Sequence, residues 1–154
     1  STRTGAAFMA NVVLTGFDEL QDAFRAIGSI PFAVTKQALD GMADVAEGKI
    51  RATGESMGVR DTDPEATVHI LDHISHSRPR KTEDGGKAFI TFTGTRQRGN
   101  TITRNAEIAF VNEYGKRGQA ARPFIGLAMT QNEKTIQDPA EEVIGDWIEK
   151  TFQG

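Results

Sequence analysis

The sequence contains no cysteine, which excludes disulfide bonds and sites in which thiolates bind a metal ion. It also lacks any apolar run of the roughly 18 to 20 residues that a membrane-spanning helix requires, so we expect no membrane partner. Basic residues are not in excess, because 18 lysines and arginines stand against 21 aspartates and glutamates, for a net charge of −3. Proteins dedicated to double-stranded DNA usually have a basic excess, so this charge balance disfavours that class.

Motifs that bind phosphate groups are missing too. Neither G-x-G-x-x-G nor G-x-x-x-x-G-K-[ST] occurs, although the chain has 16 glycines. The three histidines all fall in one segment, so no histidine elsewhere could activate a nucleophile. We therefore expect no cofactor and no catalytic residues, and we predict that the protein is not an enzyme.

Length and composition indicate a single domain. A chain of 154 residues that is 38% hydrophobic can bury one core. We expect the domain to span residues 9–154, with residues 1–8 as a disordered leader or a remnant of cloning. Near its start we expect a short extended segment over 12–14 and then a helix over 15–27.

Helical spacing of apolar residues continues beyond this first helix. It predicts a longer helix that starts at Pro31 and runs to Ile50. Polar residues and glycines then predict a loop over 52–63, and a short helix should follow from Asp63 to about Ile74. Gly41 and Gly48 each weaken the long helix by up to about 1 kcal/mol relative to alanine, so we expect a packing reason for both.

Alternation of apolar and polar residues predicts two strands in the second half of the chain. The first covers 87–93, after a turn signal at 83–86. The second is expected over Ile102–Tyr114, paired with the first across a long hairpin tip at 95–100.

Two prolines divide the C-terminal part into helices. A helix should start after Pro123, and Pro139 should kink or restart it, with Asp138 as the new cap. The fold class is therefore α+β: a small antiparallel β-sheet with a long hairpin, packed against N-terminal and C-terminal helices. Because so small a sheet needs helices or another subunit to cover it, we expect an oligomer.

The segment 105–126 combines the predicted strand, a tight basic turn and a helix start. It resembles the closing signature of the tail-completion, or head–tail joining, proteins of long-tailed bacteriophages. The segment Val13–Leu20 is similar to that family's opening. The matched positions of the closing signature are Val111, Glu113, Tyr114, Gly115, Ala121, Arg122, Pro123, Phe124, Ile125 and Ala128.

The resemblance implies a structural protein of the phage neck or tail end. Copies of it would form a ring, expected to have six members, that connects the tail tube to the head-completion proteins and lets DNA pass. Its partners would be itself and other neck and tail proteins, with DNA only as passing cargo. Its location would be the virion, after assembly in the host cytoplasm.

The same resemblance implies roles in the fold or in an interface, and none in catalysis, for six residues. These are Glu113, Tyr114, Gly115, Arg122, Pro123 and Phe124. We expect Arg122 to cap or pair with Glu113, and Phe124 to anchor the last helix in the core.

A histidine segment leaves a second function class open. On a helix, His69 and His73 lie one turn apart on one face, and His76 extends that face if the helix continues. The three side chains are weak candidates for a metal site. They also fit the polar side of a helix whose other side is apolar.

Basic residues cluster at 78–81, at 116–117 and in the predicted hairpin tip. The first two clusters are typical of charged loops that are exposed to solvent. In the hairpin tip, Arg96 and Arg98, with the nearby Arg104, fit a solvated tip, a contact to another subunit, or a contact to DNA. The alternative function is therefore a small metal-dependent or nucleic-acid-associated protein that uses the histidine segment and the Arg96–Arg98 loop. A third is an adaptor that binds one protein partner as a monomer.

Overall fold

The computed structural model describes residues 12–14, 30–61, 68–83 and 85–152. The predicted leader and the predicted first helix lie outside these residues. In chain order the elements are β1 (Val12–Leu14), α2 (Phe32–Met57), the short 3-10 helix η2 (Ile70–His73), β2 (Ile74–His76), β3 (Arg80–Thr82), β4 (Gly85–Phe92), β5 (Thr95–Arg98), β6 (Thr101–Arg104), α3 (Asn105–Tyr114), α4 (Phe124–Gln131) and α5 (Glu133–Phe152).

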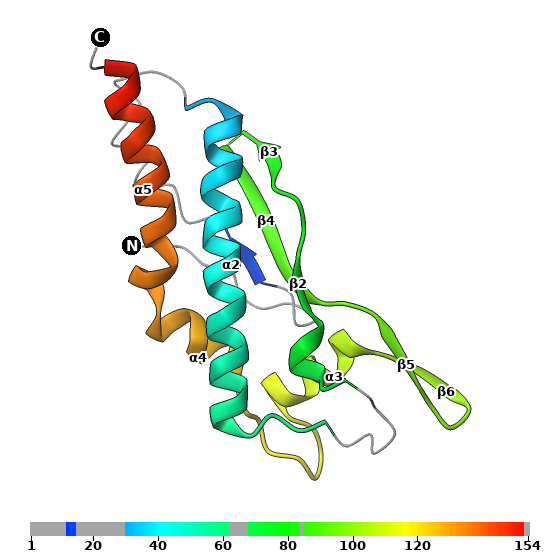
Figure 1. The fold of residues 1–154 in the computed structure, drawn as a ribbon. Helices are drawn as coiled ribbons and strands as arrows, with labels where there is room; N and C mark the ends of the chain where they lie inside the picture. Colours follow the sequence, from blue (N-terminus) through cyan, green and yellow to red (C-terminus); the bar gives the residue numbers. More distant parts are fainter. Residues whose placement is uncertain (1–11, 15–29, 62–67, 84, 153–154) are drawn as a thin grey trace.

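The long helix α2 lies between a small sheet on one side and α5 on the other (Figure 1). In the sheet, β4 is the central strand, and β1, β2 and β3 all pair with it in antiparallel orientation. A second sheet consists of β5 and β6 alone. The chain thus has an α+β fold, as the sequence predicts.

Strand β4 confirms the predicted alternation. Its buried residues are Gly86, Ala88, Ile90 and Phe92, and the residues between them are half-buried on the other face. In α2 the buried residues recur at helical spacing, which places one face of the helix in the same core.

Gly41 and Gly48, for which we expected packing reasons, have different surroundings. A Cβ atom on Gly41 would lie 2.8 Å from Cβ of Pro139, so this glycine lets α2 and α5 approach closely. A Cβ atom on Gly48 would meet nothing within 4 Å. The expectation is confirmed at Gly41 and is wrong at Gly48.

Helix α2 is longer than predicted, and the expected loop over 52–63 is wrong in its first half. The helix continues to Met57 and ends at Gly58, whose φ of 67° is left-handed. Gly54 does not break the helix, because it is buried, and a Cβ atom there would lie 2.6 Å from the side chain of Leu71. A glycine that suggests a loop in the sequence is needed here for close packing.

The predicted strand over Ile102–Tyr114 is wrong beyond Arg104, where α3 begins instead. The true partner of β6 is β5, and the two residues between them are a turn in which Gly99 has a φ of 63°. The residues 95–98, expected in a loop, are therefore a strand. The buried residues of α3 are Asn105, Ala109, Asn112 and Glu113, which fit helical spacing, and three of them are polar.

At the C-terminus, α4 begins after Pro123 as predicted. The restart expected at Asp138 is wrong, because α5 begins at Glu133 and continues through Pro139. Asp138 lies inside that helix and accepts a hydrogen bond from Lys134 at 3.2 Å. None of the helices in the described part of the chain is both long and apolar enough to cross a membrane.

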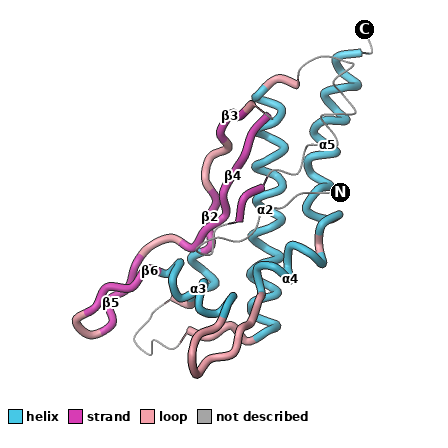
Figure 2. Tube along the Cα trace, turned by 180° about the vertical axis from the view of Figure 1, so that it is seen from behind, coloured by secondary structure: helices cyan, strands magenta, loops and turns pink. Residues whose placement is uncertain are grey.

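Strands β5 and β6 form a narrow hairpin, here called the arm, that projects from the rest of the molecule (Figure 2). It is well exposed, and Ile102 near its end has an exposed fraction of 68%. Exposed aromatic side chains also lie on α3, where the rings of Phe110 and Tyr114 are 4.8 Å apart between centroids.

Candidate functional site

The signature segment lies in α3, the turn after it and the start of α4. Asn112 at its centre is buried and holds a distant part of the chain. Its side-chain Oδ1 accepts from the backbone N–H of Arg60 at 2.8 Å, and its Nδ2 donates to the carbonyl of Arg60 at 2.9 Å and to that of Ile108 at 3.0 Å. This amide therefore ties α3 to the chain just after α2.

Glu113 caps the next helix. Its carboxylate accepts hydrogen bonds from the backbone N–H groups of Ile125 at 2.7 Å and Gly126 at 3.0 Å. These N–H groups lie in the first turn of α4, whose N-cap, Pro123, offers no side-chain cap. A carboxylate at this end also interacts favourably with the helix dipole.

The same carboxylate is buried, with 5% of the residue exposed. Burial raises the pKa of Glu113, and the two backbone hydrogen bonds lower it, with burial the larger effect. The expected pairing with Arg122 is not formed: among the described residues no hydrogen bond or ion pair joins the two side chains, and Arg122 instead donates its backbone N–H to the carbonyl of Asn112 at 2.6 Å. Phe124 is buried as expected, and its ring lies edge-on against Phe92 of β4 at 5.8 Å, which fixes α4 in the core.

The turn between α3 and α4 requires a glycine. Gly115 has a φ of 76°, and a Cβ atom there would lie 2.8 Å from the backbone nitrogen of Ala121. Beyond it, Lys116 and Gln119 exchange backbone hydrogen bonds of 3.0 and 2.9 Å, which close the turn. The side chain of Tyr114 is exposed, and Pro123 is exposed at the end of the turn.

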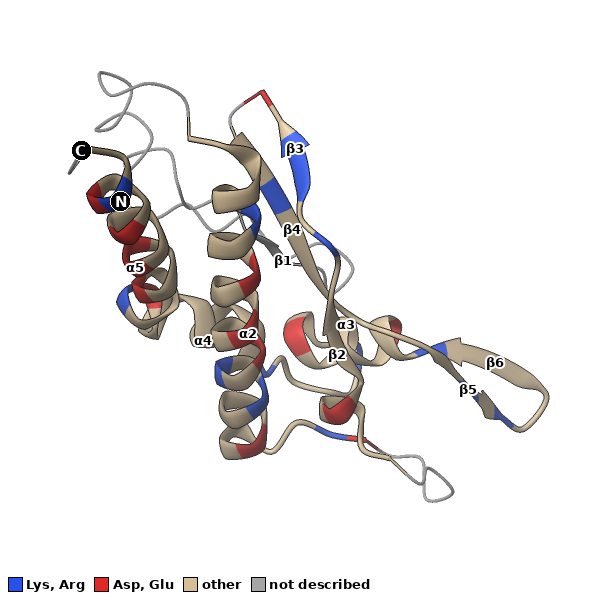
Figure 3. Ribbon diagram, turned by 45° about the horizontal axis from the view of Figure 1, so that its top comes forward, with Lys and Arg blue, Asp and Glu red and all other residues tan. Residues whose placement is uncertain are grey.

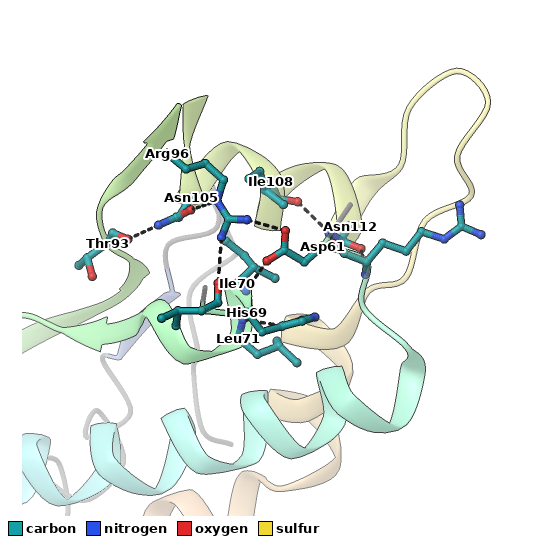
Figure 4. Close-up of polar contacts among 11 residues, drawn as sticks. Asp61, His69, Ile70, Leu71, Thr93, Arg96, Asn105, Ile108 and Asn112 are labelled. Carbon is teal, nitrogen blue, oxygen red and sulfur yellow. Dashed lines mark hydrogen bonds and ion pairs between the residues drawn. The ribbon is translucent and has the colours of Figure 1, made fainter. Parts of the chain in front are cut away.

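The base of the arm is held by a buried ion pair (Figure 4). The guanidinium of Arg96 donates to Asp61 at 2.5 Å and to the side-chain oxygen of Asn105 at 2.9 Å. Only 9% of the Arg96 side chain and 4% of the Asp61 side chain are exposed. Asp61 also accepts from the backbone N–H of Ile70 at 2.8 Å, so arm, η2 and the segment after α2 meet in one network.

Asn105 connects the two ends of the arm. Its side-chain Nδ2 donates to the carbonyl of Thr93 at 2.8 Å, and its backbone N–H donates to the carbonyl of Gly94 at 3.0 Å. Thr93 and Gly94 precede the first arm strand, and Asn105 follows the second. The network therefore sets the direction in which the arm leaves the body.

The three arginines expected to act together are separated. Arg96 points into the body and is bound there, so a solvated position in the hairpin tip is wrong for this residue, and its burial disfavours a contact with DNA or another subunit. Arg98 and Arg104 are exposed. Arg104 forms a surface pair with Glu107 at 3.2 Å.

The three histidines do not share a helical face, because His69 precedes η2, His73 ends it and His76 lies in β2. Nδ1 of His69 accepts from the backbone N–H of Leu71 at 3.1 Å, and Nδ1 of His76 lies 2.6 Å from Oε1 of Glu47 on α2. In the ranges that the structure describes, no group of three or more histidine, cysteine or acidic side chains could hold a metal ion.

One pattern with catalytic associations was missed in the sequence. The residues Gly54–Gly58 fit G-x-S-x-G, with Ser56 at the position of a nucleophile. In enzymes this pattern forms a sharp turn between a strand and a helix. Here it is the last turn of α2, so the serine does not have that geometry.

An open pocket of about 200 Å³ lies where the arm meets α3. Its lining includes the apolar Ile108 and Val111 and the cationic Arg60, Arg98 and Lys116. The buried polar side chain in this lining, Asn112, already has its hydrogen-bond partners in Arg60 and Ile108.

Comparisons with known proteins give no relative from which a function could be transferred. No protein-family model matches the chain, and neither a curated protein nor a solved structure matches it. A function therefore has to come from the chain's own geometry and from its ordered signature.

Proposed function

We propose that the chain is a structural protein of the neck or tail end of a long-tailed bacteriophage, without catalytic activity. Copies of it form a ring that connects the tail tube to the head-completion proteins and allows DNA to pass. The proposal starts from the resemblance of the segment 105–126 to the closing signature of tail-completion proteins.

The observation that carries the proposal is what the signature residues do in this fold. Glu113 caps α4, Gly115 permits the turn, and Phe124 fixes α4 in the core. The signature is thus a joint between helices, which is the role that a structural family would preserve. A catalytic signature would instead place reactive side chains together on an accessible surface.

The arm supports self-assembly. An isolated two-stranded hairpin is only marginally stable in water, yet this one is exposed along its length and is anchored to the body at its base. The arm carries the exposed Ile102, and the outer edges of β5 and β6 have no partner strand among the described residues, so another subunit could cover both. A ring supplies that contact to every copy equally.

The metal-dependent or nucleic-acid-associated alternative has less support. It needs the three histidines to converge and Arg96 to face outward. In the described residues the histidines lie on different elements, and Arg96 is bound to Asp61. The monomeric adaptor remains the alternative that predicts a different assembly state.

The test is complementation of particle assembly. The gene is deleted from the phage genome that carries it, and tails and filled heads are collected from the resulting lysate. Adding the purified chain should join tails to heads and restore infectious particles, and electron microscopy should show a ring of the chain at the tail end. Unchanged titre, with no chain bound to tails, would overturn the proposal.

The matched variant for this test changes the signature without emptying the core. Gly115→Ala should lower the yield of joined particles because it strains the turn between α3 and α4. Gly118→Ala, in the same turn but with open space around its Cβ position, should lower it much less. Equal yields from both variants would count against a role for the joint.

A further inference from the structure

The outward face of the β3–β4 strand pair is basic. Arg80 lies directly opposite Lys87 in the pairing of the two strands, so both side chains lie on the outward face, and the exposed Arg78 precedes them along the chain. Lys81 lies opposite the buried Gly86, so it leaves β3 toward the other face. Like charges directly opposite each other destabilise a strand pair. None of these four cations has a carboxylate partner among the described residues, and Lys87 lies over the ring of Phe89 at 5.5 Å.

The opposite side of the molecule has the complementary charge. Helix α5 carries six acidic residues and two lysines. Glu142 and Glu149 are seven residues apart, which places them on one line of the helix, and both are exposed on the side away from the buried Ile144. Glu141 and Asp146 are also exposed, beside that line.

The positions of the two charged surfaces decide how they could meet. Helix α2 lies between the sheet and α5, so the basic strand pair and the acidic helix face in opposite directions (Figure 3). Both β3 and the second half of α5 lie toward the same end of α2 (Figures 1 and 2). One molecule therefore cannot neutralise its own two surfaces, but a row of molecules in the same orientation can.

We propose that the β3–β4 basic face of one copy binds the acidic face of α5 of the next copy. The inference rests on the proposed ring and names its interface. Because the two surfaces differ and lie on opposite sides, the contact is head-to-tail, which closes into a ring when the rotation between copies allows it. A symmetric dimer would need the same surface on both partners.

The test reverses one surface at a time. Variant A is Arg80→Glu with Lys87→Glu, and variant B is Glu142→Lys with Glu149→Lys. Light scattering on a size-exclusion column at about 50 mM salt, where screening is weak, gives the mass in solution. The wild-type chain should have a mass several times 16.7 kDa, and each variant alone should fall to 16.7 kDa.

Mixing the variants makes the test specific. Variant A has two acidic surfaces and variant B has two basic ones, so each repels itself and complements the other. An equimolar mixture should regain the wild-type mass. A control, Arg117→Glu with Lys134→Glu, makes the same charge change as variant A at two exposed positions outside both surfaces, and it should keep the wild-type mass.

Each outcome has a distinct meaning. Circular dichroism first verifies that each variant is folded as the wild type is. A wild-type oligomer that the variants leave intact, or that the mixture fails to rebuild, overturns this interface and leaves the ring standing. A wild-type chain that stays at 16.7 kDa at its highest soluble concentration overturns both. Failed complementation of phage assembly alongside a successful mixing test overturns only the phage function.

Discussion

The buried ion pair at the base of the arm makes a quantitative prediction. Arg96→Ala removes the cation that Asp61 faces, and within the described part of the chain it leaves the carboxylate with the backbone N–H of Ile70 as its remaining partner. Asn105 loses a donor in the same change. We expect this substitution to destabilise the protein strongly and to loosen the arm.

The magnitude follows from burial. The two side chains are 9% and 4% exposed, so water does not replace the lost partner. Removing one member of a buried ion pair costs about 3 to 5 kcal/mol, and we expect about 3 kcal/mol because one hydrogen bond to the carboxylate survives. The exposed pair of Arg104 and Glu107, with 58% and 48% of the side chains exposed, is the internal comparison. Exposed pairs contribute about 0 to 1 kcal/mol, so Arg104→Ala should have a small effect.

The assay is urea unfolding followed by circular dichroism on the wild type and both variants. A double-mutant cycle with Asp61→Asn and Arg96→Met completes it, and the double variant should be less destabilised than the sum of the two single changes. Equal costs for Arg96→Ala and Arg104→Ala, or strict additivity in the cycle, would refute the claim that this pair holds the arm.

Three further predictions concern single positions. Gly48→Ala should stabilise the protein by about 0.5 to 1 kcal/mol because alanine favours a helix. Gly41→Ala should destabilise it because the new Cβ atom would meet Pro139 of α5. Urea unfolding measures both changes. Gly115→Ala should lower the free energy of unfolding by about 2 kcal/mol or more, from a left-handed φ together with a backbone clash, and Gly118→Ala by about 1 kcal/mol, from its φ alone. The last prediction compares the free energy of unfolding of the wild type with that of Glu113→Gln at different pH values. The wild type should gain most below pH 4.5, and this gain should fall as the pH rises through the raised pKa of Glu113. The reason is that the folded state binds the carboxyl proton more tightly than the unfolded state.

Particular results would contradict each of these predictions. Stabilisation by Gly41→Ala would mean that α2 and α5 do not approach closely there, and destabilisation by Gly48→Ala would contradict the open space around that position. Equal losses at the two turn glycines would remove the argument from the backbone contact at Gly115. A stability difference between the wild type and Glu113→Gln that rises with pH, or does not change, would mean that burial does not dominate the titration of this carboxyl group.

Several elements could be predicted from the sequence because only one structure satisfies their local pattern. Alternation over 87–93 fits a strand, and the buried face of β4 follows it. The stripe of apolar residues from Pro31 onward fits a helix, and Pro123 marks the start of α4. These patterns suffice for the α+β class.

The helix α3 could not be predicted in this way. The rule that apolar residues are buried and polar residues exposed fails in this segment, because Asn112 and Glu113 are buried and Phe110 is exposed. The buried polar groups are tolerated since each has a partner, and for Asn112 that partner is Arg60, 52 residues earlier. No window of sequence contains both ends of such a contact.

The sequence by itself determined the strand β4, the start and apolar face of α2, the start of α4 and the order of the signature, because in each case neighbouring residues contain the physical cause. Only the tertiary structure decided that α2 continues past Gly54, that α5 continues through Pro139, and that Arg96 is turned inward. Each of these depends on atoms distant in the chain: Leu71 beside Gly54, Gly41 beside Pro139, and Asp61 beside Arg96. Close approach and charge pairing are properties of positions in space, and folding alone brings those positions together.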